Sequence, residues 1–207
     1  IETIQENSIC SLVIAPAQIS SSSLIEAKEV ASQAIASFDG VGIYGVELFL
    51  LPSGQVLLNE IAPRPHNSGH YTMEACDIDQ FEMHIRAILG LPCPTPTMIV
   101  PCAVMVNILG EDTMEETMRI LKRAMLVPGS GIHWYGKKEA RKGRKMAHLT
   151  LTAPDIKTLG SRFEQLGTMY TKEILGLAAN AITATLFEAK NRTEILPTDS
   201  FVNEKNP

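Results

Sequence analysis

Two apolar runs separated by a short turn constrain the fold of this chain more than any other feature. Residues 41–50 read VGIYGVELFL, the turn residues are Pro52-Ser53-Gly54, and residues 55–62 read QVLLNEIA. Apolar runs on both sides of a Pro/Gly turn are typical of a β-hairpin. Because apolar residues occupy both alternating faces of these strands, we expect the hairpin to be buried on both sides.

The hairpin is expected to bring two glutamates face to face. If residues 52–55 form a four-residue loop, the opposed pairs are Leu51 and Val56, Phe49 and Leu58, and Glu47 and Glu60. Like charges opposite each other destabilise a ladder, and Mg²⁺ is one cation that would neutralise them. Two alternatives stay open. The carboxylates could have basic partners or an exposed face, and a three-residue loop would put them on opposite faces.

The segment after the hairpin, NEIAPRPHNSGHYT (residues 59–72), holds more polar chemistry than a core segment would. Pro63 and Pro65 restrict the backbone on both sides of Arg64, so the arginine is presented on a stiff segment. A planar guanidinium matches a trigonal oxyanion through two hydrogen bonds at once. The segment therefore favours a site for a small anion.

The next residues add hydrogen-bonding groups to this loop. His66, Asn67 and Ser68 supply them, and Gly69 permits a tight turn or a close backbone approach. A polar surface loop around a packed histidine is the plain alternative. His66 and His70 have the i,i+4 spacing of a zinc site on a helix, but the proline before them and the Ser-Gly pair between them disfavour a helix, so no zinc is expected.

The rest of the chain mixes strands and helices, which indicates an α+β fold. The expected strands are residues 9–16, 99–110, the HWYG segment (133–136) and the HLTLT segment (148–152). The expected helices run from a Ser23/Glu26 capping box to Phe38, over Gln80–Leu89 behind the cap pair Asp79 and Glu82, behind the capping box Thr113/Glu116, and over residues 156–177.

A proline-rich segment divides the chain. PCPTPT, at residues 92–97, is the best internal boundary because alternating prolines hold an extended linker. We therefore expect one domain over residues 1–92 and a small β-rich domain with a closing helix over 93–177. The polar residues 178–207 are expected to form a tail or a linker to a following domain.

A cluster of basic residues lies between the last two expected strands. Six cations occur within nine residues: Lys137, Lys138, Arg141, Lys142, Arg144 and Lys145. With Glu139 this window carries +5 (6 − 1), whereas the whole chain carries −5. A short basic patch on an acidic chain favours a small phosphorylated ligand over nucleic acid, which would need a longer stripe with stacking aromatics. A solvated face is the plain alternative.

The sequence shows no signal for a membrane or a secreted location. No apolar run approaches the roughly 20 residues that span a bilayer, and no signal peptide is visible, so no membrane partner is expected. The four cysteines lack CxxC spacing and a small secreted framework, which predicts reduced thiols in the cytoplasm. The chain begins at Ile1 in mid-pattern, which suggests a fragment of a longer parent protein.

Several of these motifs carry a family resemblance. GVELF (45–49), NEIAPRPHNSGH (59–70) and FEMHIRAILGLP (81–92) resemble the C-terminal half of the ATP-grasp core in the 5-(carboxyamino)imidazole ribonucleotide synthetase family. HWYGKKEARKGRKMAHL (133–149) is similar to the part of that family's small C-terminal domain that reaches the nucleotide substrate. The linker-like tail resembles the connector of the two-enzyme fungal form.

The resemblance implies a reaction in purine biosynthesis. ATP phosphorylates bicarbonate to carboxyphosphate, and the amine of 5-aminoimidazole ribonucleotide captures the carboxyl group. The implied roles are two Mg²⁺ ions at Glu47 and Glu60 with Asn59 beside the ATP, a bicarbonate and carboxyphosphate loop of Arg64, His66, Asn67 and Ser68, and a substrate-phosphate site of Arg144 and Lys145 with Lys137 or Lys138. The family commonly has one residue fewer in the last segment, so the choice between the two lysines stays open.

Two other functions remain possible. One is another ATP-grasp ligase, of the formate-dependent glycinamide ribonucleotide transformylase type. The other is a non-catalytic module that binds a phosphate ligand or nucleic acid. If the family resemblance holds, the lobe with the adenine pocket should precede Ile1, and the parent is expected to be a homo-oligomer. The isolated chain is then expected to be inactive, with the first strand (residues 9–16) leaving one edge unpaired.

Overall fold

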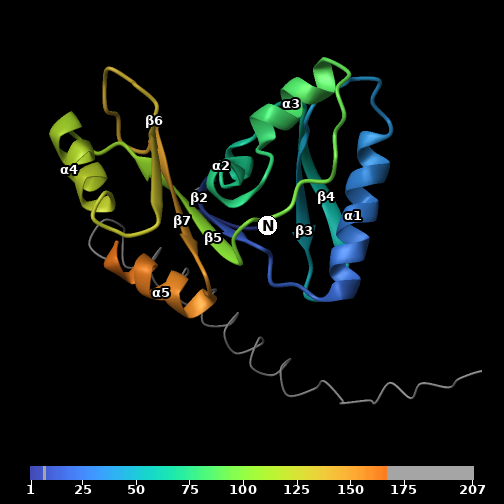
Figure 1. The fold of residues 1–207 in the computed structure, drawn as a ribbon, viewed down its shortest axis with the longest axis horizontal. Helices are drawn as coiled ribbons and strands as arrows, with labels where there is room; N and C mark the ends of the chain where they lie inside the picture. Colours follow the sequence, from blue (N-terminus) through green and yellow to red (C-terminus); the bar gives the residue numbers. More distant parts are fainter. Residues whose placement is uncertain (7, 167–207) are drawn as a thin grey trace, which may run out of the picture.

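The computed structural model describes residues 1–6 and 8–166 of the chain, and these residues form an α+β fold (Figure 1). A five-stranded antiparallel sheet has the order β1-β2-β5-β7-β6, and a separate two-stranded sheet pairs β3 with β4. The strands are β1 (Glu2–Glu6), β2 (Ile9–Ala15), β3 (Gly45–Leu50), β4 (Val56–Ala62), β5 (Cys102–Leu109), β6 (Ser130–Trp134) and β7 (Lys145–Ala153). The helices are α1 (Ser21–Ile35), α2 (Thr72–Ala75), α3 (Gln80–Ile88), α4 (Met114–Ala124) and α5 (Ile156–Gln165), with a 3₁₀ turn at Asn67–Gly69.

The main core lies on one face of the five-stranded sheet. Helices α4 and α5 cover this face (Figure 1). Alternate residues of β2, β5 and β7 point into this core, because successive side chains of a strand face opposite sides. The fully buried side chains there include Leu12, Ile14, Val106, Ile108, Leu149, Leu151, Leu159 and Phe163. The intervening residues, among them Asn107 and His148, therefore face the other side.

The five-stranded sheet joins segments from both sides of the proline-rich linker. Strand β2, from before the linker, pairs with β5, from after it, with Val13 opposite Met105. Strand β1, which was not expected, pairs with the other edge of β2. The prediction that the strand at residues 9–16 leaves an edge unpaired is therefore wrong, because β1 occupies that edge.

The hairpin is confirmed, but its register near the turn differs from the expected one. Leu50 lies opposite Val56 and Phe49 opposite Leu57, one residue away from the predicted pairs. The register then shifts between Glu47 and Leu48, and Glu47 lies opposite Glu60 as predicted. The Leu51 N–H donates to the Gln55 carbonyl (2.9 Å), so the loop has the three residues 52–54, and the extra residue on β4, Asn59, forms a bulge that restores the glutamate pair.

The prediction that the hairpin is buried on both faces is wrong for the described chain. Phe49 is 54% exposed, and Leu57 and Leu58 are 40% and 44% exposed. Helix α1 packs along the hairpin, mostly against β4 (Figure 1). A two-stranded sheet covered by one helix leaves apolar side chains in water, so this surface has the character of an interior face.

The N-terminal ends of the helices show which capping predictions are correct. The N-cap of helix α1 is Ser20, three residues before the expected cap Ser23, and the Ser20 hydroxyl accepts a hydrogen bond from the Ser23 N–H (3.1 Å). The Ser23/Glu26 capping box is therefore wrong. The Glu26 carboxylate accepts from the Val56 N–H of β4 instead (3.1 Å). The helix also ends at Ile35, before Phe38.

The other caps largely follow the sequence. Asp79 caps α3 by accepting from the N–H groups of Phe81 and Glu82, but the Glu82 carboxylate bonds Arg86 and does not complete a box. Thr113 and Glu116 form the predicted reciprocal capping box of α4. Helix α5 is confirmed over Ile156–Gln165, and the rest of the expected helix and the tail lie outside the described residues.

Candidate functional site

The two glutamates of the hairpin lie next to the polar loop. Glu47 and Glu60 are opposed residues of β3 and β4, and Glu60 is exposed while the Glu47 side chain is 23% exposed. Asn59, on the bulge, donates a hydrogen bond from Nδ2 to Glu47 Oε2 (3.3 Å). His66 Nε2 lies 3.7 Å from Glu47 Oε1. Within the described residues neither carboxylate is paired with a lysine or arginine, so two carboxylates of like charge face each other without a strong cation.

His66 is held from three sides. Its Nδ1 is hydrogen-bonded to the Ser68 hydroxyl (2.8 Å). Its backbone N–H donates to Gln80 Oε1 (2.8 Å), and its carbonyl accepts from Gln80 Nε2 (3.0 Å). Gln80 is the first residue of α3 and is buried. The start of this helix therefore fixes the backbone of the loop.

Two glycines make room for this arrangement. A Cβ on Gly69 would lie 2.4 Å from Gln80 Oε1, and a Cβ on Gly45 would lie 2.6 Å from the His66 Cβ. Both distances are far below van der Waals contact. Gly69 was expected to permit a tight turn or a close approach, and it lies in the 3₁₀ turn Asn67–Gly69 with the Gln80 side chain directly against it.

Arg64, in the loop that follows β4, is exposed. Its Nη1 donates to the carbonyl of Pro65 (3.1 Å), and no acidic residue of the described chain forms an ion pair with it. A guanidinium in this state keeps most of its donors available for an anion. This is the property for which the sequence singled out Arg64.

Asn67 joins the polar loop to the basic segment, which lies 78 residues further along the chain. Its Oδ1 accepts hydrogen bonds from Lys145 Nζ (3.0 Å) and from Asn107 Nδ2 (2.8 Å). Its Nδ2 donates to Asn107 Oδ1 (2.9 Å). The tertiary structure thus brings two candidate sites together.

The predicted phosphate-binding residues differ in their surroundings. Lys137 is half-buried, donates to the carbonyl of Lys145, and lies 5.4 Å from the centre of the Tyr135 ring. Desolvation, followed by repulsion from Arg144 and Lys145, lowers the pKa of Lys137. Lys138 is exposed. Arg144 is exposed as well and donates to the carbonyl of Glu139 (3.4 Å). Lys137, Arg144 and Lys145 are therefore close enough to repel one another.

Behind the loop three imidazole rings form a stack. His148 lies between His70 and His133, with ring centroids 4.5 Å and 4.6 Å away. The His148 Nδ1 accepts from the Tyr135 hydroxyl (2.8 Å), and His133 Nε2 is 2.5 Å from the Glu74 carboxylate of α2. The stack packs β6 and β7 against α2 and the loop.

Burial sets the protonation of this stack. Desolvation, reinforced by the neighbouring histidines, lowers the pKa of His148 to about 3. Desolvation and repulsion from His133 and Lys145 lower the pKa of His70 to about 4. Burial raises the pKa of Tyr135 to about 12, against the opposing effect of the Asn67 hydrogen bond. At neutral pH these three groups are uncharged.

The sequence analysis missed several residues that build the site. Gln80, Asn107, Tyr135 and His148 were not singled out, although each contacts a predicted residue or its partner. A signal was present for two of them. Asn107 and His148 are polar residues inside the apolar strands CAVMVNIL and KMAHLTLTA, and a buried polar group needs a partner.

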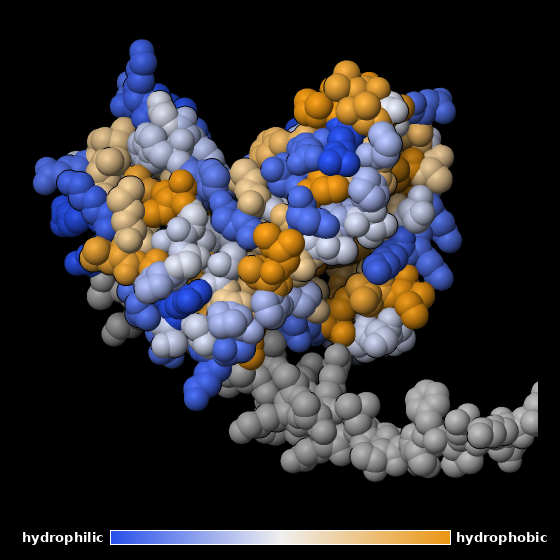
Figure 2. Space-filling view, viewed as in Figure 1, coloured by the Kyte–Doolittle hydropathy of each residue, from blue (hydrophilic) through white to orange (hydrophobic). Residues whose placement is uncertain are grey.

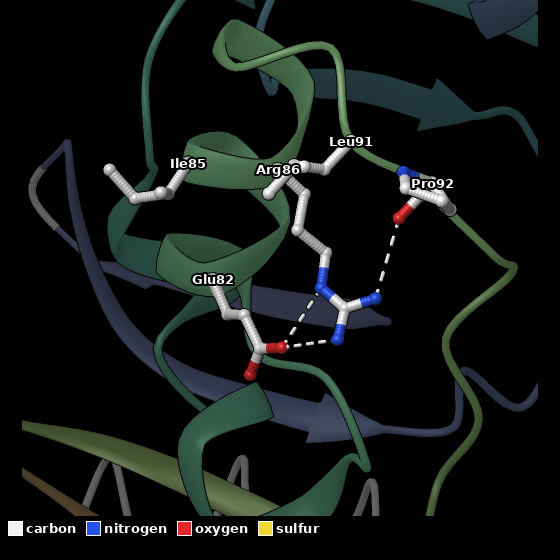
Figure 3. Close-up of a pocket in the computed structure, with 5 residues that line it drawn as sticks. All are labelled: Glu82, Ile85, Arg86, Leu91 and Pro92. Atoms are coloured by element: carbon white, nitrogen blue, oxygen red, sulfur yellow. Dashed lines mark hydrogen bonds and ion pairs between the residues drawn. The ribbon is translucent and has the colours of Figure 1, made fainter.

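A pocket beside α3 contains none of the predicted site residues. Arg86 of α3 lies between Glu82 and the carbonyl of Pro92, so its charge is already neutralised (Figure 3). Leu91 and Ile85 complete the lining of this pocket. Hydrophobic residues gather at the same end of α3 (Figure 2), where Leu89 is 65% exposed.

The fold and this site define the C-terminal portion of an ATP-grasp ligase. Residues 1–81 match the family model of the ATP-grasp domain. Residues 103–162 match the model of the phosphoribosylaminoimidazole carboxylase C-terminal domain. The chain belongs to the family of N5-carboxyaminoimidazole ribonucleotide synthetases and fungal phosphoribosylaminoimidazole carboxylases, and it corresponds to their C-terminal ATP-grasp part and the domain after it.

Individual relatives show the extent of the similarity. The phosphoribosylaminoimidazole carboxylase of Schizosaccharomyces pombe is 48% identical over 170 residues, which is 80% of this chain and 31% of the relative. The chloroplastic phosphoribosylaminoimidazole carboxylase of Vigna aconitifolia is 46% identical over 157 residues, 74% of this chain and 28% of the relative. The chain therefore spans about a third of the length of these curated relatives.

Among solved structures, an N5-carboxyaminoimidazole synthase from Aspergillus clavatus aligns with a TM-score of 0.75 and 43% identity. The alignment covers 79% of this chain and 44% of that protein, which was crystallised with ADP and 5-aminoimidazole ribonucleotide. In the part of our chain that the structure describes, no cluster of three or more metal-binding side chains is present, and no helix is long and apolar enough to cross a membrane.

Proposed function

We propose that this chain supplies the carboxylating half of an ATP-dependent ligase that acts on 5-aminoimidazole ribonucleotide in purine biosynthesis. In this reaction ATP transfers its γ-phosphoryl group to bicarbonate, and the amine then attacks the activated carbon as phosphate leaves. The hydrogen bond between Lys145 and Asn67 is the observation that carries the proposal, because it joins the anion loop to the basic segment. Both substrates of the carboxyl transfer would then lie within one site.

We assign the metal role to Glu47 and Glu60. Two opposed carboxylates with no lysine or arginine partner fit a divalent cation, since Mg²⁺ takes one or two carboxylates and leaves its other positions for phosphate oxygens and water. Mg²⁺, of which two ions are expected, would spread the charge of the ATP phosphates. Asn59 would orient Glu47 through their hydrogen bond.

The anion loop would hold bicarbonate and its phosphorylated form. Arg64 has donors available, and His66 is fixed by Ser68 and Gln80 close to Glu47. Fixed donors aimed at a developing charge can supply several kcal/mol of barrier reduction. Asn67 has a different role in this proposal, because protein groups already use its hydrogen-bonding capacity. It would orient Lys145.

The substrate phosphate would lie against Lys137, Arg144 and Lys145. Desolvation, and after it repulsion from Arg144 and Lys145, lowers the pKa of Lys137, and a bound phosphate would relieve the repulsion. Lys137 is favoured over Lys138 because Tyr135 and the Lys145 carbonyl hold it beside Lys145, whereas Lys138 is exposed.

The remaining features of the proposal concern the whole protein. ATP-grasp ligases clamp the triphosphate between two lobes, so we propose that this chain is inactive without the further sequence that its relatives contain. We also propose that the boundary between the two domains lies between residues 92 and 93. We propose further that the protein is cytoplasmic with reduced thiols and that the parent protein is a homo-oligomer. The four unpaired cysteines are consistent with that location, although one relative is chloroplastic.

A chimera tests this function. The chain would replace the homologous region of the Schizosaccharomyces pombe enzyme, and bicarbonate-dependent ATP hydrolysis with 5-aminoimidazole ribonucleotide would be measured. Glu47→Gln and Glu60→Gln should each abolish turnover, whereas the exposed Glu29→Gln on α1 should leave it unchanged. Near-normal turnover of either hairpin variant at saturating Mg²⁺ would contradict the metal assignment. Binding of RNA that weakens steeply with salt and needs no Mg²⁺ would favour a nucleic-acid module instead.

A further inference from the structure

The buried amide of Asn107 has no role in the functions described so far. Asn107 lies on β5, is 1% exposed, and faces away from the main core. Its Nδ2 donates to the Cys10 carbonyl of β2 (2.7 Å) and to Asn67 Oδ1 (2.8 Å), and its Oδ1 accepts from Asn67 Nδ2 (2.9 Å). A buried amide with three hydrogen bonds is held in one orientation.

The orientation of this amide pair is determined at both ends. A backbone carbonyl such as that of Cys10 can only accept, so Asn107 must turn its NH₂ group toward β2. An ammonium such as that of Lys145 can only donate, so Asn67 must turn its oxygen toward Lys145. If the Asn67 amide were reversed, NH₂ would face NH₂ and oxygen would face oxygen across the pair. Asn107 therefore determines which atom of Asn67 meets the lysine.

The amide pair thus positions Lys145 by a direct hydrogen bond between its ammonium and the Asn67 oxygen.

We infer that Asn107 is a positioning residue for carboxyl transfer, which fixes the Asn67 amide so that the anion loop and Lys145 keep one geometry. The catalytic consequence of this inference rests on the proposed function, whereas its structural part does not. Asn107 would act through Asn67, because its side-chain hydrogen bonds are with Asn67 and a backbone carbonyl.

The structural part can be tested on the 207-residue chain by NMR. In the wild-type chain the side-chain NH₂ group of Asn67 donates to Asn107 Oδ1, and the proton in this hydrogen bond should exchange slowly with water. Asn107→Leu should raise the exchange rate of this proton at least about tenfold, which corresponds to ~1.4 kcal/mol. Thr150→Val is the matched control, because Thr150 is a buried residue of the neighbouring strand whose hydroxyl has no hydrogen-bond partner. Unchanged Asn67 exchange in the leucine variant would overturn the inference.

A shorter side chain guards against misfolding. If the leucine variant does not fold, Asn107→Thr keeps one donor for the Cys10 carbonyl but cannot reach Asn67 with an amide. Its Asn67 exchange should also rise about tenfold. Slow exchange in a folded threonine variant would likewise overturn the inference.

The catalytic part uses the chimera. Asn107→Leu should raise the KM for 5-aminoimidazole ribonucleotide about tenfold and change the KM for ATP less than about twofold, while Thr150→Val changes neither. In an Asn67→Ala background the further effect of Asn107→Leu should disappear. An equal effect in both backgrounds would refute action through Asn67. If the wild-type chimera itself fails to carboxylate, the proposed function fails, and the NMR result still decides the structural role.

Discussion

Acidification from pH 7 to pH 5 should destabilise the chain mainly through two histidines of the stack. His148 and His70 have pKa values lowered to about 3 and about 4, so both stay neutral in the folded chain over this range. In the unfolded chain each takes up a proton near pH 6.5. Because the unfolded state then binds more protons, the free energy of unfolding falls as the pH falls.

The size of the effect follows from these pKa values. Between pH 7 and pH 5 each histidine contributes a loss of about 2 kcal/mol, and the pair contributes about 4 kcal/mol. Asp77 and Asp155 do not interfere, since their pKa values lie below the usual 3.8 and they lose their stabilising effect only at lower pH. The interval therefore reports mainly on histidines.

His148→Asn separates the stack from other titrating groups. The asparagine oxygen takes the place of Nδ1 and still accepts from the Tyr135 hydroxyl, but the side chain cannot be protonated. Urea unfolding followed by circular dichroism at both pH values should show a loss about 2 kcal/mol smaller than in the wild-type chain. Thr150→Val, on the same strand, should keep the full loss. An unchanged pH dependence in His148→Asn would refute the assignment of a lowered pKa to this histidine.

Three further predictions concern single contacts. In the chimera, Lys137→Ala should raise the KM for 5-aminoimidazole ribonucleotide about ten- to a hundredfold, as expected for a charge-assisted hydrogen bond, while Lys138→Ala changes it less than about twofold; equal effects would contradict the choice of Lys137. Gly69→Ala should destabilise the chain by about 1–3 kcal/mol in urea unfolding, because its Cβ would meet Gln80 Oε1, and a change below about 0.5 kcal/mol would show that the loop can yield. The exposed apolar face of the hairpin should make the chain self-associate, and Leu57→Lys should reduce this association in light scattering because it puts a charge on that face. Unaltered association would show that the chains do not associate through the hairpin.

The hairpin shows how far local patterns reach. The place of its turn and its two strands follow from the sequence, because apolar runs around a Pro/Gly turn leave few other arrangements. The bulge at Asn59 does not follow. The expected four-residue loop gave the correct glutamate pair only because the shorter turn and the bulge compensate each other. Which residues pair next to a turn depends on the number of residues in the turn, and the presence of Pro and Gly does not specify that number.

Burial of the hairpin was decided by what packs on it. The sequence indicates strands that are apolar on both faces, which is the property of an interior sheet. In the described chain α1 is the main cover, so Phe49 and Leu57 remain in water. The apolar pattern of the strands indicates that both faces of the hairpin are suited to burial. The tertiary structure shows which elements of the described chain pack on those faces.

By itself, the sequence determined the chemistry of the two candidate sites and their family. Three features carried this information: the arginine between two prolines, the pair of carboxylates and the basic cluster. Each lies within a short stretch of sequence, so it can be recognised without knowing the fold. Only the tertiary structure decided that these parts form one site. Asn107 pairs with Asn67 and bonds the Cys10 carbonyl because β2 and β5 are neighbours in the sheet, although residues 10 and 107 lie far apart in the chain. Contacts over such separations depend on which strands pair, and strand pairing is a property of the whole fold.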